Sequence, residues 1–112
     1  MVSQFNIENF IKAGRVTIFS KSYCPYCVWA KKLFADIETE ITVYEVDLET
    51  NKFNKAAELV LHNDSKFSTY PKIYIGTKCY GGYNDVSKLL ESTRLFEILK
   101  SEEIRFIDDD MF

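Results

Sequence analysis

The sequence predicts an α/β fold, a four-stranded mixed sheet flanked by helices in the order α-βαβ-α-ββ-α. An apolar strand at 15–20, a helical pattern and an alternating strand at 41–46 form a βαβ unit, which requires a parallel, right-handed crossover. Further on, strands at 72–75 and 78–81 are separated by a Gly-Thr dipeptide, a two-residue loop typical of an antiparallel hairpin. Parallel and antiparallel pairs are therefore expected in one sheet.

The first element is predicted to be a helix over 3–13. Ser3 can cap its N-terminus and Gly14 can end it. Its buried stripe is expected to comprise Ile7, Phe10 and Ile11. The strand that follows, RVTIFS, is apolar almost throughout, which is typical of a strand covered on both faces. Helices are therefore expected on each side of the sheet.

Two helices with clear apolar faces are predicted before and after the strand at 41–46. The first follows the cysteine pair, and its buried face comprises Cys27, Ala30, Phe34 and Ile37. The second covers 52–62, where apolar residues match helical spacing at i, i+3, i+4, i+7 and i+8. Those residues are Phe53, Ala56, Ala57, Val60 and Leu61.

Short helices around 84–90 and 93–100 are predicted to finish the fold. The chain contains no linker or repeat, and 112 residues suffice for a single core. We therefore expect one domain over residues 1–112, with 103–112 as an acidic C-terminal tail.

Composition and charge narrow the classes of function. The net charge is −3 and the lysines are scattered, which argues against a nucleic-acid partner because such binding needs a clustered basic surface. No apolar run approaches the roughly 20 residues of a membrane span, and the N-terminus lacks the pattern of a secretory signal. Three cysteines are few for a secreted disulfide scaffold, so we expect a cytoplasmic protein.

Cys24 and Cys27, within the stretch SKSYCPYCVWAKKLF, allow three interpretations. A structural disulfide would close a very small loop and would constrain the unfolded chain little. A metal site needs more ligands, and Cys79 and His62 do not come in the paired spacing of a structural zinc site. The third interpretation is a working redox pair, and the local pattern favours it.

Cys24 directly follows a strand and stands at the start of a helix, where free backbone N–H groups and the helix dipole favour an anion. Pro25 occupies the first helical position, where its missing N–H costs nothing. Lys21 adds a nearby positive charge. Cys27, one turn on, faces inward and is expected to be shielded. An exposed thiolate beside a resolving thiol is the arrangement that thiol–disulfide exchange requires.

Over nearly its whole length the chain resembles a dithiol glutaredoxin of the CPYC type, in the thioredoxin superfamily. CPYC at 24–27 matches the active-site tetrapeptide of that family. STYP at 68–71 falls where the family has Thr-Val-Pro, and GGYNDV at 81–86 falls at its Gly-Gly-x-x-Asp stretch. The resemblance implies a thioredoxin fold and a glutathione-dependent thiol–disulfide oxidoreductase.

The resemblance also implies roles for individual residues. Cys24 would be the nucleophile and Cys27 the resolving thiol. A cis Pro71 would let the backbone of Tyr70 pair with the cysteinyl unit of glutathione as an added strand. The glutathione site implied in this way comprises Lys21, Tyr26, Thr69, Tyr70, Pro71, Gly82, Asn84 and Asp85.

Within this implied site, Lys21 would pair with the glycyl carboxylate, Tyr26 would pack over the ligand, and the turn at 82–85 would hold the γ-glutamyl end. Three positions depart from the family pattern, one of them Tyr70, which stands where the family has valine. Ser68 stands where an arginine is common, and Glu58 stands where a glutamine is common. A carboxylate at Glu58 would repel the glycyl carboxylate unless it points away.

The implied reaction is the reduction of protein–glutathione mixed disulfides and protein disulfides, with glutathione as co-substrate and without a metal. The expected partners are glutathione and glutathionylated or disulfide-bonded proteins, and no nucleic acid or membrane; we expect a monomer. Two alternatives remain open. One is a binding module that carries an iron–sulfur cluster between two chains, held by glutathione and Cys24. The other is a thioredoxin-type enzyme reduced by a dedicated reductase.

Overall fold

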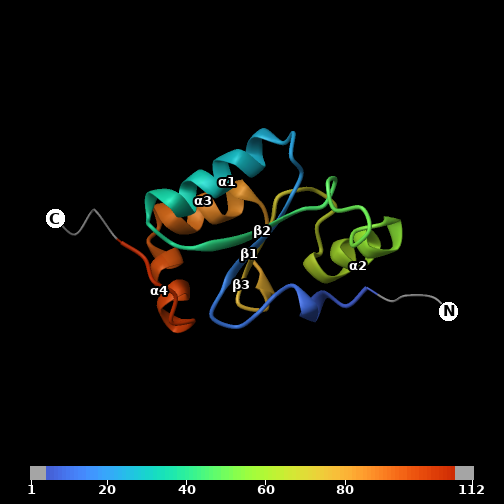
Figure 1. Ribbon diagram of the computed structural model, residues 1–112. Helices are drawn as coiled ribbons and strands as arrows, with labels where there is room; N and C mark the ends of the chain where they lie inside the picture. The colour runs from blue at the N-terminus through green and yellow to red at the C-terminus, as the bar shows by residue number, and fades with distance from the viewer. Residues whose placement is uncertain (1–4, 108–112) are drawn as a thin grey trace.

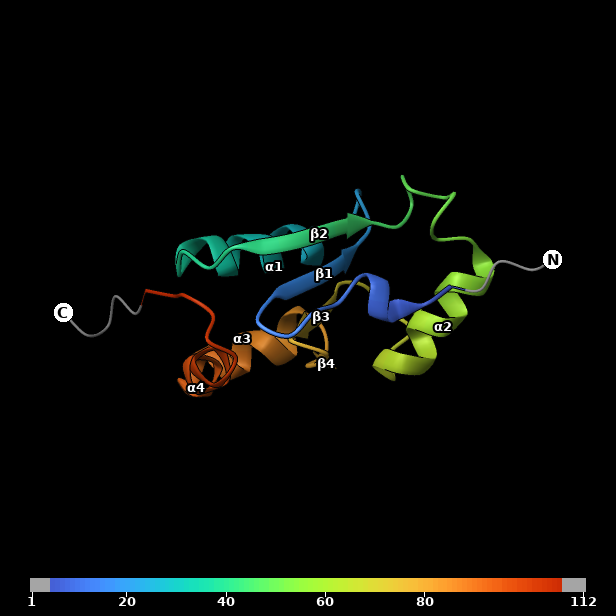
Figure 2. The same cartoon turned by 60° about the horizontal axis from the view of Figure 1, so that its bottom comes forward.

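A four-stranded sheet organises the chain in the computed structural model, which describes residues 5–107 (Figure 1). The strands are β1 (Val16–Ser20), β2 (Ile41–Glu45), β3 (Lys72–Ile75) and β4 (Lys78–Cys79). Their order in the sheet is β2-β1-β3-β4, which is followed most easily in Figure 2. β1 is parallel to β2 and antiparallel to β3, and β3 is antiparallel to β4. The predicted mixed sheet is confirmed.

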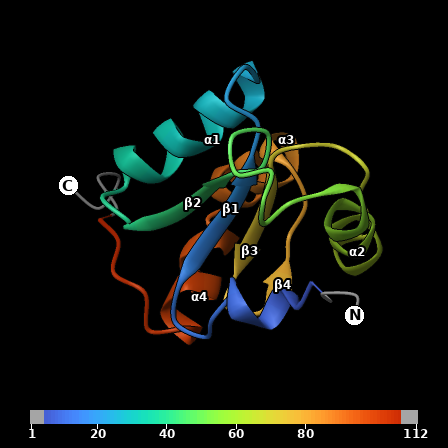
Figure 3. The same ribbon diagram turned by 45° about the vertical axis from the view of Figure 1, so that its right-hand side comes forward.

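Helices cover both faces of this sheet (Figure 3). They are the short 3-10 helix η1 (Ile7–Asn9) and the α-helices α1 (Pro25–Asp36), α2 (Lys55–Ser65), α3 (Tyr83–Glu91) and α4 (Arg94–Ser101). The last two lie within a residue of the ranges expected from the sequence. One core joins the sheet to α1, α3 and α4, and a second joins it to α2 and the segment around η1.

Strand β1 separates the two cores, because successive side chains of a strand point to opposite faces. Val16 and Ile18 belong to the core under α1, whereas Phe19 belongs to the core under α2. All five residues of β1 are buried, as the apolar run predicted. The strand is therefore held from both sides, which gives Cys24 just beyond it a rigid support.

The prediction of a helix over 3–13 is wrong for the part of that range that the structure describes. Only the three residues of η1 are helical there, with the Asn6 side chain accepting from the N–H of Glu8; Ser3 lies outside the described residues. Short helices gain most of their stability from packing. Here irregular backbone achieves that packing, since the Phe10 ring stacks on Phe5 and meets Tyr44 edge-on.

The helix predicted over 52–62 exists but is displaced toward the C-terminus. α2 begins after Asn54, and its buried positions are Ala57, Leu61 and Ser65, while Phe53 is buried just before the helix. Ala56 and Val60, expected in the buried face, are exposed. Positions four apart form a narrow stripe, so α2 contacts the rest of the fold along one line rather than across a broad face.

Asn54 caps α2, because its Oδ1 accepts from the backbone N–H of Ala57 at 2.9 Å. We expect Asn54→Ala to lower the free energy of unfolding by about 1 kcal/mol, since that helical N–H loses its acceptor. Urea denaturation followed by circular dichroism measures this. Asn51→Ala, in the exposed turn before the helix, is the control. An equal loss in both variants would contradict the capping role.

The segment after α4 returns to the fold. Ile104 is only 9% exposed and packs in the core under α1. The Thr39 hydroxyl donates to the carbonyl of Arg105 at 2.8 Å, and the Ile107 N–H donates to the carbonyl of Ile37 at 2.7 Å. The first half of the expected tail therefore packs against the end of α1. Its three aspartates at 108–110 lie outside the described residues.

Between residues 5 and 107, none of the helices combines the length and the apolar character that crossing a membrane would demand.

Candidate active site

The two cysteines lie where β1 leads into α1. Cys24 is the N-cap residue of α1, and its Sγ accepts from the backbone N–H of Cys27 at 3.3 Å. Pro25 is the first residue of the helix, as predicted. Cys24 is partly exposed and Cys27 is fully buried, which matches the expected division between an accessible and a shielded sulfur. The helix start thus directs a free N–H at the accessible sulfur.

Cys27 is held as a thiol by its surroundings. Burial raises the pKa of Cys27 to about 11, although hydrogen bonds from Ser20 and from the backbone of Lys21 act in the opposite direction. The Lys21 N–H lies 3.5 Å from Cys27 Sγ. At neutral pH Cys27 is therefore protonated, and it can act as a nucleophile only after it loses a proton.

The loop before β3 lies against the accessible cysteine. The Tyr70–Pro71 peptide bond is cis, as the resemblance implied. Cys24 Sγ donates to the Tyr70 carbonyl at 3.8 Å. Residues 46 positions apart in the sequence are thereby brought together at one end of the sheet.

Lys72 is a site-shaping residue that the sequence reasoning missed. Its side chain is fully buried, and its Nζ donates to the carbonyls of Phe67 at 2.5 Å and Thr69 at 3.1 Å. Nζ also lies 4.8 Å from the centroid of the Tyr70 ring. Burial lowers the pKa of Lys72 to about 8. The sequence does contain a signal for this burial: Lys72 is a single lysine at the start of the otherwise apolar strand KIYI, directly after Pro71.

Lys21, Glu58 and Tyr70 form a connected group beside the cysteines. Lys21 Nζ lies 3.3 Å from Glu58 Oε1 and 4.9 Å from the centroid of the Tyr70 ring. The Tyr70 hydroxyl donates to the same Glu58 oxygen at 3.0 Å. Glu58 therefore points toward Lys21, the residue assigned by resemblance to the glycyl carboxylate.

The ionisation of this group follows from its contacts. Burial acts to raise the pKa of Glu58, but hydrogen bonds from Tyr70 and Lys21 outweigh it, and the pKa of Glu58 is lowered. Burial, followed by the hydrogen bond to Glu58, raises the pKa of Tyr70. At neutral pH Glu58 is ionised and the Tyr70 hydroxyl keeps its proton.

The Gly81-Gly82 turn completes the arrangement and leads into α3. Gly81 has φ +105°, and a Cβ there would lie 2.4 Å from Asp85 Oδ2. The Gly82 N–H donates to the same Asp85 oxygen at 3.0 Å. A Cβ on Gly82 would lie 3.5 Å from the Pro71 carbonyl oxygen. The turn thus lies against Pro71, with the exposed Asn84 and Asp85 in the first turn of α3.

An aromatic group extends the site along α1 and α3. Tyr26 is 47% exposed, and its ring meets the Trp29 ring edge-on, with centroids 5.0 Å apart. Tyr83 is at the start of α3, and the centroid of its ring lies 5.8 Å from that of the Trp29 ring. Tyr26 is therefore open to solvent two residues after Cys24, as a residue that covers a ligand would be.

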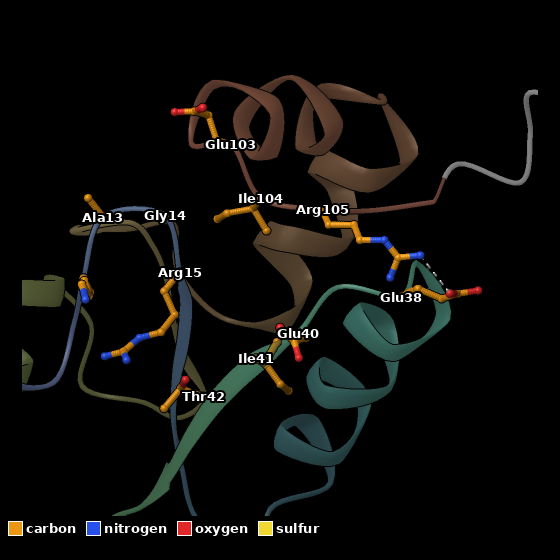
Figure 4. Close-up of a pocket in the computed structure, with 11 residues that line it drawn as sticks. Ala13, Gly14, Arg15, Glu38, Glu40, Ile41, Thr42, Glu103, Ile104 and Arg105 are labelled. Atoms are coloured by element: carbon orange, nitrogen blue, oxygen red, sulfur yellow. Dashed lines mark ion pairs between the residues drawn. The ribbon is translucent and has the colours of Figure 1, made fainter.

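A cavity of about 890 Å³ lies at the end of the sheet opposite the cysteines (Figure 4). Charged side chains of both signs line it, among them Arg15, Glu38, Glu40 and Arg105. Figure 4 shows Arg105 directed at Glu38, with which it pairs at 3.8 Å. Arg15 precedes β1 whereas Cys24 follows it, so this cavity is separate from the cysteine site.

Within the described part of the chain, no three or more His, Cys, Asp or Glu side chains gather to hold a metal ion.

The sheet, the Cys-x-x-Cys pair at the start of α1 and the cis proline beside it define a thiol–disulfide oxidoreductase of the thioredoxin fold. The glutaredoxin family model matches residues 16–80. Glutaredoxin-2 of Schizosaccharomyces pombe is 33% identical over 93 residues, which are 83% of this chain and 83% of that protein. Glutaredoxin-1 of Homo sapiens is 30% identical over 91 residues, 80% of this chain and 86% of that protein. The chain belongs to the glutaredoxin family.

Solved structures agree with this assignment. The buckwheat glutaredoxin–glutathione complex matches with a TM-score of 0.72 at 30% identity, covering 79% of this chain and 78% of that one. The dithiolic glutaredoxin of Trypanosoma brucei brucei matches with a TM-score of 0.75 at 31% identity, covering 88% and 99%. The expected thioredoxin fold is confirmed. These findings do not favour an iron–sulfur carrier.

Proposed function

We propose that this glutaredoxin uses glutathione to reduce protein–glutathione mixed disulfides and protein disulfides. The observation that carries the proposal is the position of Cys24, partly exposed at the start of α1 beside the Tyr70 carbonyl, with the buried Cys27 thiol one turn behind. The structural relative from buckwheat is a glutaredoxin in complex with glutathione, which supports glutathione as the co-substrate.

In the first step the Cys24 thiolate attacks the glutathione sulfur of a mixed disulfide. The disulfide bond between the glutathione sulfur and the protein sulfur breaks, the protein thiolate leaves and takes up a proton, and glutathione remains on Cys24 through a new disulfide bond. A second glutathione, as its thiolate, then attacks the sulfur of the bound glutathione. Glutathione disulfide leaves and the Cys24 thiolate is restored.

A protein disulfide requires the second cysteine. Cys24 attacks one sulfur of the protein, and the other leaves as a thiol. Cys27 then loses its proton and attacks Cys24, which releases the reduced protein and forms a Cys24–Cys27 disulfide. Two molecules of glutathione reduce that disulfide. The burial of Cys27 is consistent with a residue that reacts only with its neighbour.

Glutathione would lie across the loop and turn that surround Cys24. Its cysteinyl backbone would pair with Tyr70 beside Thr69 and Pro71, and its γ-glutamyl end would meet the start of α3 at Gly82, Asn84 and Asp85. Tyr26 would cover the ligand, and the glycyl end would approach Lys21. The odd number of cysteines fits a reducing compartment such as the cytoplasm, where we propose that the protein acts as a monomer.

A comparison of two conjugates tests the proposed function. A peptide with one cysteine is linked through a disulfide either to glutathione or to free cysteine, and its reduction is followed with glutathione, glutathione reductase and NADPH. We expect kcat/KM to be about tenfold or more higher for the glutathione conjugate, because free cysteine lacks the γ-glutamyl and glycyl groups. Equal values for the two conjugates, or no turnover of either, would contradict a glutathione site.

A further inference from the structure

We infer that Glu58 is a specificity-determining residue for the thiol substrate, because it compensates the charge of Lys21. The site then accepts a glutathione whose glycyl carboxylate is replaced by a neutral amide about as well as glutathione itself. This inference rests on the proposed function and names the class of thiol that the same site takes.

The ion pair between Lys21 and Glu58 is anchored from two sides. Glu58 Oε1 lies 3.3 Å from Lys21 Nζ and accepts from the Tyr70 hydroxyl at 3.0 Å. Tyr70 in turn precedes the cis proline and has its carbonyl at Cys24. Because the Tyr70 hydroxyl also holds the carboxylate, the pair has less freedom than one between two exposed side chains.

Partial burial strengthens the effect of the Glu58 charge on Lys21. The side chains of Lys21 and Glu58 are 22% and 30% exposed, so water screens their charges less than it would at an open surface. Glu58 is ionised at neutral pH, since its pKa is lowered. Hydrogen bonds from the hydroxyl and backbone of Ser22 lower the pKa of Asp47, and the charge of Lys21 adds a smaller effect, so Asp47 supplies a second negative charge near the same ammonium.

The other nearby groups do not offer a second cation with which a glycyl carboxylate could pair directly. Lys72 is charged at neutral pH, but its ammonium is fully buried and donates to the carbonyls of Phe67 and Thr69. Burial and the charge of Lys72 lower the pKa of His62, so its imidazole is neutral at pH 7. Lys21 is the one cation among the residues assigned to glutathione, and its charge is already balanced.

The consequence for a ligand follows from its charge. A glycyl carboxylate near Lys21 gains attraction from the ammonium and loses a similar amount to repulsion by Glu58. A terminal amide meets no such repulsion, and its NH₂ group can donate to the free oxygen of Glu58. The pair therefore weakens discrimination between the two thiols, and loss of the Glu58 charge should restore a preference for the carboxylate.

The experiment measures a single reaction step on two matched substrates. A fluorescent peptide is linked through a disulfide to glutathione or to glutathione amide, and release of the peptide is followed with reduced enzyme in excess. The ratio of the two second-order rate constants reports recognition of the glycyl end, because the reactivity of Cys24 and any loss of folded protein cancel in it. Glu58→Gln removes the charge and keeps an acceptor for Tyr70. The control, Glu45→Gln, removes the same charge from the Lys31–Glu45 pair, whose side chains are 30% and 25% exposed.

We expect the glutathione-to-amide ratio of the wild type to lie within about threefold of one, and Glu58→Gln to raise it about three- to tenfold. Glu45→Gln should leave the ratio within about twofold of the wild type. A wild-type ratio above about ten, or the same ratio in Glu58→Gln and wild type, would overturn the inference. If neither conjugate reacts with the wild type, the proposed function itself fails, which is a separate result.

Discussion

Replacing Cys24 with serine will abolish reduction of glutathione mixed disulfides, whereas replacing Cys27 with serine will leave that reaction in place. The serine hydroxyl is not ionised at neutral pH and is a poor nucleophile toward sulfur, so we expect a loss of at least about 10³-fold in kcat/KM for Cys24→Ser. Cys27→Ser keeps the accessible sulfur and the backbone N–H that donates to it at 3.3 Å. The two sulfurs should therefore separate into one that starts the reaction and one that resolves it.

The same pair of variants should behave differently with a protein disulfide. Without the Cys27 thiol, the complex between Cys24 and the protein cannot be released internally, so Cys27→Ser should accumulate this complex. Non-reducing electrophoresis and mass spectrometry detect it. Cys79→Ser serves as the control, because Cys79 lies on β4 and packs in the core under α2. The division of roles fails if Cys27→Ser is inactive on the mixed disulfide, or if Cys79→Ser accumulates the same complex.

The second large effect concerns Lys72. As pH rises from about 8 to about 10.5, the free energy of unfolding of the wild type should increase relative to that of Lys72→Met. Burial lowers the pKa of Lys72 from 10.5 to about 8, so in this window the unfolded chain holds a proton that the folded protein has released. Stability therefore rises with pH, and below about pH 8 the penalty for burying the ammonium is fully present. The difference can reach about 3 kcal/mol.

Urea denaturation at several pH values, with reductant present, measures this difference for the wild type and Lys72→Met. Taking the difference between the two proteins removes the contributions of other groups that titrate in the same range, including the Cys27 thiol. Lys78→Met, at an exposed lysine of β4, is the matched control. A constant difference between wild type and Lys72→Met from pH 7 to pH 10 would show that Lys72 keeps its proton throughout.

Lys72→Met should also weaken the loop that lies against Cys24. The substitution keeps the length and apolar stem of the side chain but removes the donors to the carbonyls of Phe67 and Thr69. Each carbonyl loses its hydrogen bond to the ammonium, although the Phe67 carbonyl still accepts from the Ser65 hydroxyl, so the loop is held less firmly. We therefore expect KM for the glutathione conjugate to rise severalfold at pH 7, where Lys72 is protonated.

The order of elements could be predicted from the sequence because each depends on nearby residues. The apolar run at 15–20 identified β1, the Gly-Thr dipeptide identified the β3–β4 hairpin, and the CPYC stretch placed Cys24 at a helix start. The prediction of a helix over 3–13 was wrong because the apolar residues there reach the core from a segment that is mostly not helical. The prediction of where α2 begins and which of its residues are buried was wrong. Helical spacing shows which residues share a face, but not how wide a strip of that face the rest of the fold contacts.

The sequence by itself determined which two cysteines stand together at the start of a helix, where the proline loop and the glycine turn fall, and the family to which the chain belongs. Only the tertiary structure decided that Lys72 is buried under the loop and that Glu58 turns toward Lys21. Both features depend on partners brought close by folding: the carbonyls that receive the Lys72 ammonium, and an ammonium 37 positions before Glu58. Residue type and periodicity describe a side chain's own segment, whereas the charge that it meets is set by the segments packed against it.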